Sequence, residues 1–163
     1  MDMEKHSFAG ALTTSLFLET IRLNGRLLAS GDRLVAGLGL TSARWQVLGA
    51  VVMAERPMPV PHIARQMGLS RQNVQRIVND LDDVGYVTFA PNPHHKRAKL
   101  VVLTDRGRET YDAAHRVQVP WANALGAATT PEDLQTALRV LQSLRAALDK
   151  EQTDPAEQLA STR

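Results

Sequence analysis

Apolar residues recur at steps of three and four along most of the chain, which predicts a mainly helical fold. The first run extends from about Phe8 to Val35, and its apolar stripe is broad and longer than an average helix needs. Gly37 and Gly39 then break the pattern. A second helix is expected to begin at Thr41 or Ser42, with a core face of Trp45, Leu48 and Val52 and with Val47 and Val51 beside it.

Two helices joined by a tight turn are predicted next, which is the pattern of a helix-turn-helix. After a short extended piece at 58–60, Pro61 suits the first position of a helix that faces Ile63, Ala64 and Met67 inward. Gly68 ends that helix, and Ser70 caps the next one, which runs to Val84 before Gly85. Its buried face is expected to hold Val74, Ile77, Val78 and Leu81.

The opposite face of the helix from Ser70 to Val84 suits hydrogen bonding to base edges. Arg can pair with guanine, and Asn or Gln can pair with adenine. The acidic residues lie toward the C-terminal end, away from the basic N-terminal half. Taken alone, the segment also fits a solvated helix packed on a core. The polar face consists of Gln72, Gln75, Arg76 and Asn79.

A β-hairpin is predicted after Gly85. The β-prone segments 86–89 and 99–103 flank a basic, proline-containing tip at 90–98. Such a hairpin after a helix-turn-helix makes a winged helix, whose tip can place Lys96 or Arg97 in a narrow minor groove. The alternative is a solvated loop.

Two further helices are predicted toward the C-terminus. Thr104 caps the first, which Pro120 should kink or interrupt. Thr130 caps the second, with Pro131 at its first position and an apolar stripe through Leu148. The apolar side of the first holds Tyr111, Ala114, Val117, Trp121, Ala124 and Leu125. These helices and the N-terminal one carry too much apolar surface for a small domain, so pairing with a second copy of the chain is expected.

The predicted organisation is a winged helix-turn-helix flanked by dimerisation helices. Residues 1–39 form an N-terminal arm and helix, 40–104 the DNA-binding region, 105–150 the C-terminal dimerisation helices and 151–163 a disordered tail. No apolar run approaches the roughly 20 residues needed to span a bilayer, and the start lacks a signal-peptide pattern. A cytoplasmic protein without a membrane partner is expected. Without cysteine, disulfides and thiol redox switches are excluded.

Charge is unevenly distributed, although the net charge is only +2. The segment 56–108 holds nine basic and four acidic residues, which leaves it at +5 and the remainder at −3. A basic middle between acidic flanks indicates a polyanion site. Within it, Arg65, Arg71 and Lys96 are candidates for salt-dependent phosphate contacts.

Several motifs in order resemble the MarR family of transcriptional regulators. The first motif is Leu40-Thr41 followed by 45–48, and the second extends from 63–64 to 69–70. The third extends from 74–78 through Leu81 to Gly85-Tyr86. The wing segment comes next, and Leu103-Thr104 and Gly107 follow it. The resemblance spans about 12–148. It implies a homodimer, a winged helix-turn-helix in each subunit and, usually, repression of nearby genes.

The resemblance also implies roles for single residues. Arg97 falls where the wing arginine of the family enters the minor groove. His95 stands where the family commonly has an aspartate that orients this arginine, and a histidine cannot form that carboxylate–arginine pair. His95 could touch phosphate instead, with pH-dependent affinity. The positions of the major-groove contacts are Ser70, Gln72, Asn73, Gln75 and Arg76.

Many relatives bind a small aromatic acid or phenol between the dimer helices and the winged domain. Trp45, Met53, Tyr111 and His115 could line such a space here, or Trp45 and Met53 could be ordinary core. No cofactor or metal is expected, because His94 and His95 have no carboxylate or cysteine at suitable spacing. No motif of an enzyme occurs. The remaining rivals are a ligand-binding protein without specific DNA binding and a transcriptional activator.

Overall fold

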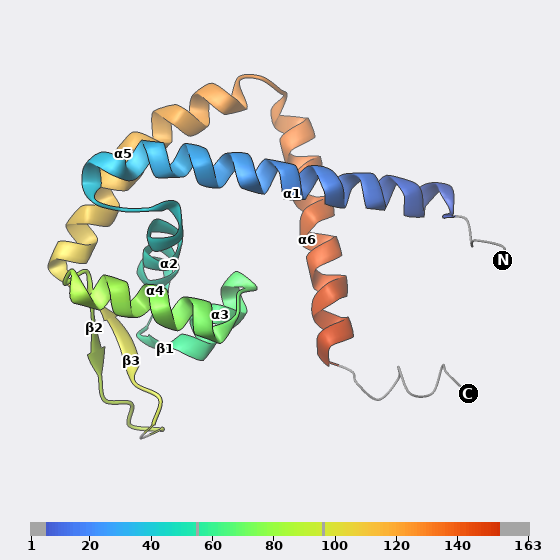
Figure 1. Ribbon diagram of the computed structural model, residues 1–163. Coiled ribbons are helices and arrows are strands. Elements are labelled where there is room, and N and C mark those ends of the chain that lie inside the picture. The colour runs from blue at the N-terminus through green and yellow to red at the C-terminus, as the bar shows by residue number, and fades with distance from the viewer. Residues whose placement is uncertain (1–5, 55, 96, 154–163) are drawn as a thin grey trace, which may run out of the picture. The chain divides into compact units, whose positions relative to one another are not determined.

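The computed structural model describes residues 6–54, 56–95 and 97–153, and these residues are mainly helical (Figure 1). The chain consists of two compact units, Met1–Gln118 and Val119–Arg163. In chain order the elements are α1 (Phe8–Val35), the 3₁₀ helix η1 (Ala36–Leu38), α2 (Ser42–Met53), β1 (Met58–Pro59), α3 (Val60–Met67), α4 (Arg71–Asp83), β2 (Val87–Ala90), β3 (Leu100–Leu103), α5 (Asp105–Gly126) and α6 (Pro131–Thr153).

A small antiparallel sheet lies beside α3 and α4, and its strand order is β1-β3-β2. Strands β2 and β3 form the predicted hairpin, with Val87 opposite Leu103 and Ala90 opposite Leu100. The short strand β1 pairs with β3 on the other side, with Met58 opposite Val101. The predicted fold class, mainly helical with a small β wing on a helix-turn-helix, is therefore confirmed (Figure 1).

The core of the first unit lies between α2, α3, α4 and the sheet. The predicted stripe of α4 is confirmed, because Val74, Ile77, Val78 and Leu81 are all buried. Ile63 and Ala64 of α3 pack into the same core, and Val87 and Val101 contribute from the strands. One face of α4 is thus fixed by burial, which leaves its other face outward.

Three local predictions differ from the structure. On α2 the buried residues are Val47, Leu48 and Val51, whereas Trp45 and Val52 are only half-buried. Because α2 is apolar on several sides, its partners decide which side is buried. Helix α3 begins one residue before Pro61. Of the predicted kink or interruption at Pro120, the interruption is wrong, because α5 continues through this residue.

Large apolar side chains remain exposed on the long terminal helices. On α1 the exposed residues are Phe8, Leu12, Phe17, Leu18, Ile21, Leu23 and Leu27, and only Gly31 and Val35 are buried. On α6 they are Leu134, Leu138, Val140, Leu141 and Leu148. Helix α6 continues to Thr153, three residues into the predicted tail, and 154–163 lie outside the described residues.

Among the described helices, no single one is long and apolar enough to cross a membrane. The segments Phe8–Leu38 and Ser42–Met53 reach the required length and apolar composition only when taken together, and they are bent by 79° relative to each other.

Candidate nucleic-acid interface

Helix α4 turns a continuous polar face outward. Its first turn is capped by Ser70, whose Oγ accepts a hydrogen bond from the backbone N–H of Asn73 at 3.2 Å. At its other end Gly85 adopts φ 75°, a conformation that suits glycine. A shallow depression on this side of the helix is lined by Arg71, Gln72, Gln75, Arg76 and Asn79. We call this surface the outer face of α4.

Hydrogen bonds along the helix order the side chains of this outer face. The Nε2 amide of Gln75 donates to Oδ1 of Asn79 at 2.9 Å, and a terminal nitrogen of Arg76 donates to Oδ1 of Asn73 at 3.2 Å. Each group retains further donors or acceptors, because an amide offers both and a guanidinium carries five N–H donors. The face can therefore be ordered and still bind bases.

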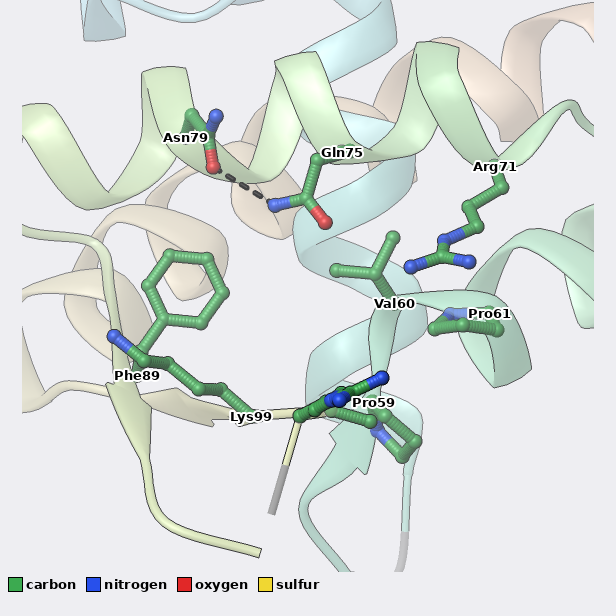
Figure 2. Close-up of a pocket in the computed structure, with 10 residues that line it drawn as sticks. Pro59, Val60, Pro61, Arg71, Gln75, Asn79, Phe89 and Lys99 are labelled. Atoms are coloured by element: carbon green, nitrogen blue, oxygen red, sulfur yellow. Dashed lines mark hydrogen bonds between the residues drawn. The ribbon is translucent and has the colours of Figure 1, made fainter. Parts of the chain in front are cut away.

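A hollow of about 300 Å³ lies between α4 and the wing, and we call it the helix–wing hollow (Figure 2). Arg71 lines it from the start of α4, and Arg97 and Lys99 line it from the wing. The ammonium of Lys99 lies 5.9 Å from the ring centre of Phe89, which also lines the hollow. Three cations around one hollow attract a polyanion such as a phosphate backbone. The remaining lining residues are Pro59, Val60, Pro61, Gln75, Asn79 and Ala98.

The tip of the wing is a turn built on Asn92. Its side-chain oxygen accepts from the backbone N–H of His94 at 3.0 Å, and its carbonyl accepts from that of His95 at 3.3 Å. His95 is exposed there, as is Arg97. Lys96 lies outside the described residues. Arg65, an exposed residue of α3, lines neither the outer face of α4 nor the helix–wing hollow.

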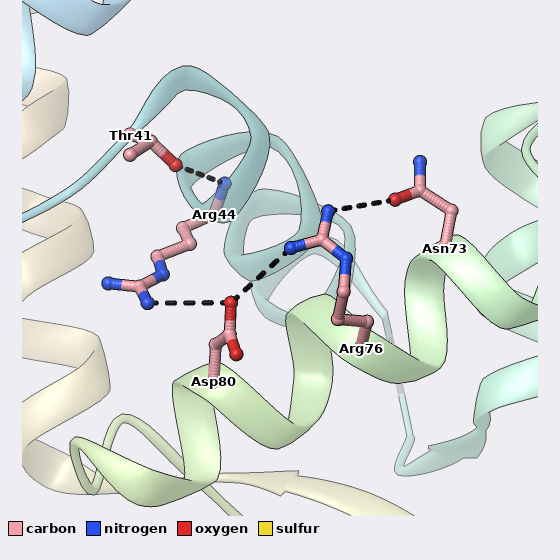
Figure 3. A network of polar contacts seen from close by, with 5 residues as sticks. All are labelled: Thr41, Arg44, Asn73, Arg76 and Asp80. Atoms are coloured by element: carbon pink, nitrogen blue, oxygen red, sulfur yellow. Dashed lines mark hydrogen bonds and ion pairs between the residues drawn. The ribbon is translucent and has the colours of Figure 1, made fainter.

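An ion-pair network links the outer face of α4 to α2 (Figure 3). Oδ2 of Asp80 lies 3.4 Å from a terminal nitrogen of Arg44 and 3.8 Å from one of Arg76. The sequence predicts that the acidic residues of α4 lie away from its basic N-terminal half, whereas the structure pairs Asp80 with Arg76. The spacing from Arg76 to Asp80 is that of neighbours on a helix surface and could have indicated the pair. Nothing local in the sequence points to Arg44.

A second hollow, of about 570 Å³, lies between α2 and α5 within the first unit, and we call it the α2–α5 hollow. It brings together the four residues predicted to surround an effector, namely Trp45, Met53, Tyr111 and His115. The alternative interpretation, in which Met53 is ordinary core, is wrong, because this side chain is 79% exposed. The rings of Tyr111 and His115 stack with their centres 6.5 Å apart. The other lining residues are Gln46, Gly49, Ala50, Met67 and Gln118.

The winged helix and its neighbours have counterparts among known proteins. The sequence model of the MarR family matches residues 38–98, from η1 to the tip of the wing. The transcriptional activatory protein BadR of Rhodopseudomonas palustris is 30% identical over 122 residues, which cover 71% of this chain and 68% of BadR. The chain belongs to the MarR family.

Two further comparisons extend the match beyond the winged helix. The uncharacterized protein Rv2011c of Mycobacterium tuberculosis is 37% identical over 136 residues, which cover 83% of this chain and 94% of that protein. A solved structure of CouR, described as a transcriptional repressor bound to a 23-mer DNA duplex, shares the fold with a TM-score of 0.72 and 22% identity. It covers 86% of this chain and 99% of CouR.

Membership in the MarR family makes this chain a winged-helix, DNA-binding transcriptional regulator. The residues matched by the family model include the whole of α4 and the network partner Arg44. The residues Tyr111, His115 and Gln118 of the α2–α5 hollow lie beyond that match.

Proposed function

We propose that this protein is a homodimeric repressor that binds a pseudo-palindromic DNA duplex and is released by a small aromatic effector. One observation carries the proposal. The outer face of α4, with its Arg, Gln and Asn side chains, borders a hollow that Arg71, Arg97 and Lys99 surround. Base-reading groups thus adjoin a phosphate-attracting hollow, as DNA recognition requires.

The predicted contacts divide by chemistry. Gln72, Asn73, Gln75 and Arg76 would read bases in the major groove, with Ser70 at the start of the helix. Arg65, Arg71 and Lys96 would contact phosphates, and His95 could add a contact from the wing. Arg97 would enter the adjacent minor groove. CouR, which shares the fold, is bound to a DNA duplex in its solved structure, and this supports a DNA duplex as the partner of this chain.

A second copy of the chain is the proposed partner of the terminal helices. Ile21 is 69% exposed on α1 and Leu138 is 56% exposed on α6, alongside further large apolar residues of both helices. Exposed apolar surface of this extent marks an interface. A two-fold dimer would also place two α4 helices in successive major grooves of a pseudo-palindrome.

The α2–α5 hollow is the proposed effector site. Its walls are mainly apolar and aromatic, with His115, Gln46 and Gln118 as polar groups that could bind a phenolic hydroxyl or a carboxylate. An effector there would have to prefer a conformation in which the two α4 helices no longer match the groove spacing.

Activation is the second candidate for the direction of regulation, because the relative BadR is named an activatory protein. A bound dimer represses when its site overlaps that of the polymerase, and it activates when it recruits the polymerase from upstream. A reporter gene driven by the promoter upstream of this gene distinguishes repression from activation. Repression predicts that deletion of this gene raises expression, and a fall would indicate activation.

Fluorescence anisotropy of the purified protein with its own upstream DNA, against scrambled DNA across a salt series, tests specific binding. We expect tighter binding to the upstream DNA, a steep salt dependence and two chains per duplex. Equal, weak binding to both duplexes would mean either that the operator lies elsewhere or that α4 does not read bases. No binding at low salt would favour the rival of a ligand-binding protein without specific DNA binding.

A further inference from the structure

One carboxylate of α4 lies among the residues proposed to read DNA. Asp80 is four residues beyond Arg76, and its Oδ2 lies 3.8 Å from the guanidinium of that residue (Figure 3). A negative charge at this position would repel phosphates and would also oppose the dipole near the C-terminal end of the helix. Its presence therefore calls for a specific role.

The second partner of Asp80 comes from a different helix. Arg44 of α2 approaches the same oxygen at 3.4 Å, and the backbone N–H of Arg44 donates to the Oγ1 of Thr41, the cap of α2. The Asp80 and Arg44 side chains are only 33% and 30% exposed, whereas that of Arg76 is 69% exposed. The carboxylate and Arg44 are thus partly shielded from solvent, while the guanidinium of Arg76 reaches into it.

We infer that Asp80 is a positioning residue that orients Arg76 for base reading and that Arg44 holds Asp80 in place. This inference rests on the proposed function, in which Arg76 contacts a base. Asp80 lies beside one terminal nitrogen of Arg76, and Asn73 accepts a hydrogen bond from the other, so contacts on both sides favour one orientation of the long side chain. The guanidinium still has free N–H donors for a bidentate contact with guanine.

Ordering before binding explains why a carboxylate is tolerated here. An unrestrained arginine loses much rotamer freedom when it binds a base, and a prior ion pair removes part of that loss from the binding step. The charge of Arg44 compensates that of Asp80, so the three groups together still carry +1 toward DNA. Asp80 therefore tunes specificity without reversing the attraction.

The test uses a duplex that the unaltered protein selects from a random-sequence pool. Affinities are measured for this duplex and for variants with each base pair changed in turn. Arg76→Ala identifies the base pair that Arg76 reads. We expect Asp80→Asn to lose about five- to tenfold of the discrimination at that base pair, as expected for coupled neighbours, and to change discrimination elsewhere by less than about twofold.

Two further variants separate orientation from charge and from folding. Asp83→Asn is the matched control, because it removes the same charge from the last turn of the same helix at an exposed position. Arg44→Gln leaves α4 itself unchanged and is expected to weaken discrimination at the same base pair as Asp80→Asn. In the Arg76→Ala background, Asp80→Asn is expected to have no further effect on discrimination.

Three outcomes would overturn the inference. If Asp80→Asn, like Asp83→Asn, tightens binding to every duplex with unchanged discrimination, Asp80 contributes only charge. If Asp80→Asn does not fold, unchanged discrimination in Arg44→Gln refutes the link through α2. If the unaltered protein selects no sequence at all, the proposed function fails and this inference fails with it.

Discussion

Two arginines of α4 have different surroundings, and different contacts with DNA are therefore proposed for them. Arg71 lies at the start of the helix and lines the helix–wing hollow together with Arg97 and Lys99. Arg76 lies five residues later on the outer face and contacts Asn73 and Asp80. A cation among cations suits a phosphate, whereas a restrained guanidinium suits one base.

Substitution of the two arginines should therefore have different consequences. Arg71→Ala is expected to weaken binding to all DNA similarly and to reduce the salt slope by about 1. Arg76→Ala is expected to cost about 1–3 kcal/mol on the selected duplex and much less on random DNA. Anisotropy titrations of both variants on both duplexes check this. Equal losses on the two duplexes for Arg76→Ala would refute its base-reading role.

Gly107 shows a second residue-scale constraint, which the sequence indicated only through resemblance. A Cβ at this position of α5 would overlap the backbone carbonyl of Tyr86, which accepts a hydrogen bond from the backbone N–H of Thr104, while the Thr104 hydroxyl donates to the neighbouring carbonyl of Gly85. Because that carbonyl is held by the start of α5, relief by movement is costly.

Gly107→Ala is accordingly expected to destabilise the protein by about 1–3 kcal/mol, as overpacking commonly does. Gly126→Ala is the matched control on the same helix, since no described atom lies within 4 Å of its Cβ position. Urea unfolding followed by circular dichroism measures both. An unchanged midpoint for Gly107→Ala would mean that the backbone at Tyr86 yields more easily than its hydrogen bonds suggest.

At the scale of elements, features encoded locally could be predicted from the sequence, and features encoded by contact could not. The caps at Thr41, Ser70 and Thr130 are confirmed, because each depends on a side chain and an amide three residues away. The prediction of the core face of α2 is wrong in part, because a helix that is apolar on several sides is buried on the side where its partners pack. The pair of Arg44 and Asp80 joins residues far apart in sequence.

In the candidate site, too, some features could be predicted from local sequence and others depend on contacts between elements. Periodicity predicted the outer face of α4, because burial of the opposite stripe fixes the orientation of a helix. The resemblance named the residues of the α2–α5 hollow, but its lining by Gly49 and Met67 depends on packing between helices. Lys99 was absent from the predicted site, although it lies in the helix–wing hollow beside Phe89.

The wing is expected to act as a separate reading element. Arg97→Ala should weaken binding more for a duplex with A·T-rich flanks than for one with G·C-rich flanks, because a narrow minor groove attracts arginine. Arg71→Ala, on the opposite side of the same hollow, serves as the control and should affect both flanks alike. Titration of the two duplexes with each variant decides the matter. Equal effects of Arg97→Ala on both flanks would make the wing a phosphate contact only.

At the scale of the whole molecule, the terminal helices decide whether the chain works alone. Helix α1 extends over 28 residues, and much of its large apolar surface is exposed. Burying such a face in a second copy removes apolar area from water, which is worth about 25 cal/mol for each Å². The proposed dimer rests on this surface, and it would supply the symmetry that a pseudo-palindromic site requires.

Introducing a charge on α1 should therefore break the dimer. Ile21→Glu is expected to shift the protein toward monomer at micromolar concentration, because a carboxylate would have to be buried without a partner. Ile21→Leu keeps the apolar character and should leave the dimer intact. Sedimentation equilibrium measures the association of both. A dimer of Ile21→Glu as tight as that of the unaltered protein would place the interface elsewhere.

Hydroxyl-radical footprinting on the duplex selected by the protein tests most directly whether α4 and the wing bind DNA as a two-fold pair. The account predicts two patches of backbone protection related by two-fold symmetry, with centres about 10–10.5 base pairs apart. It also predicts flanking minor-groove protection that the Arg97→Ala variant loses. A single unsymmetrical patch, or uniform protection along the duplex, would contradict it.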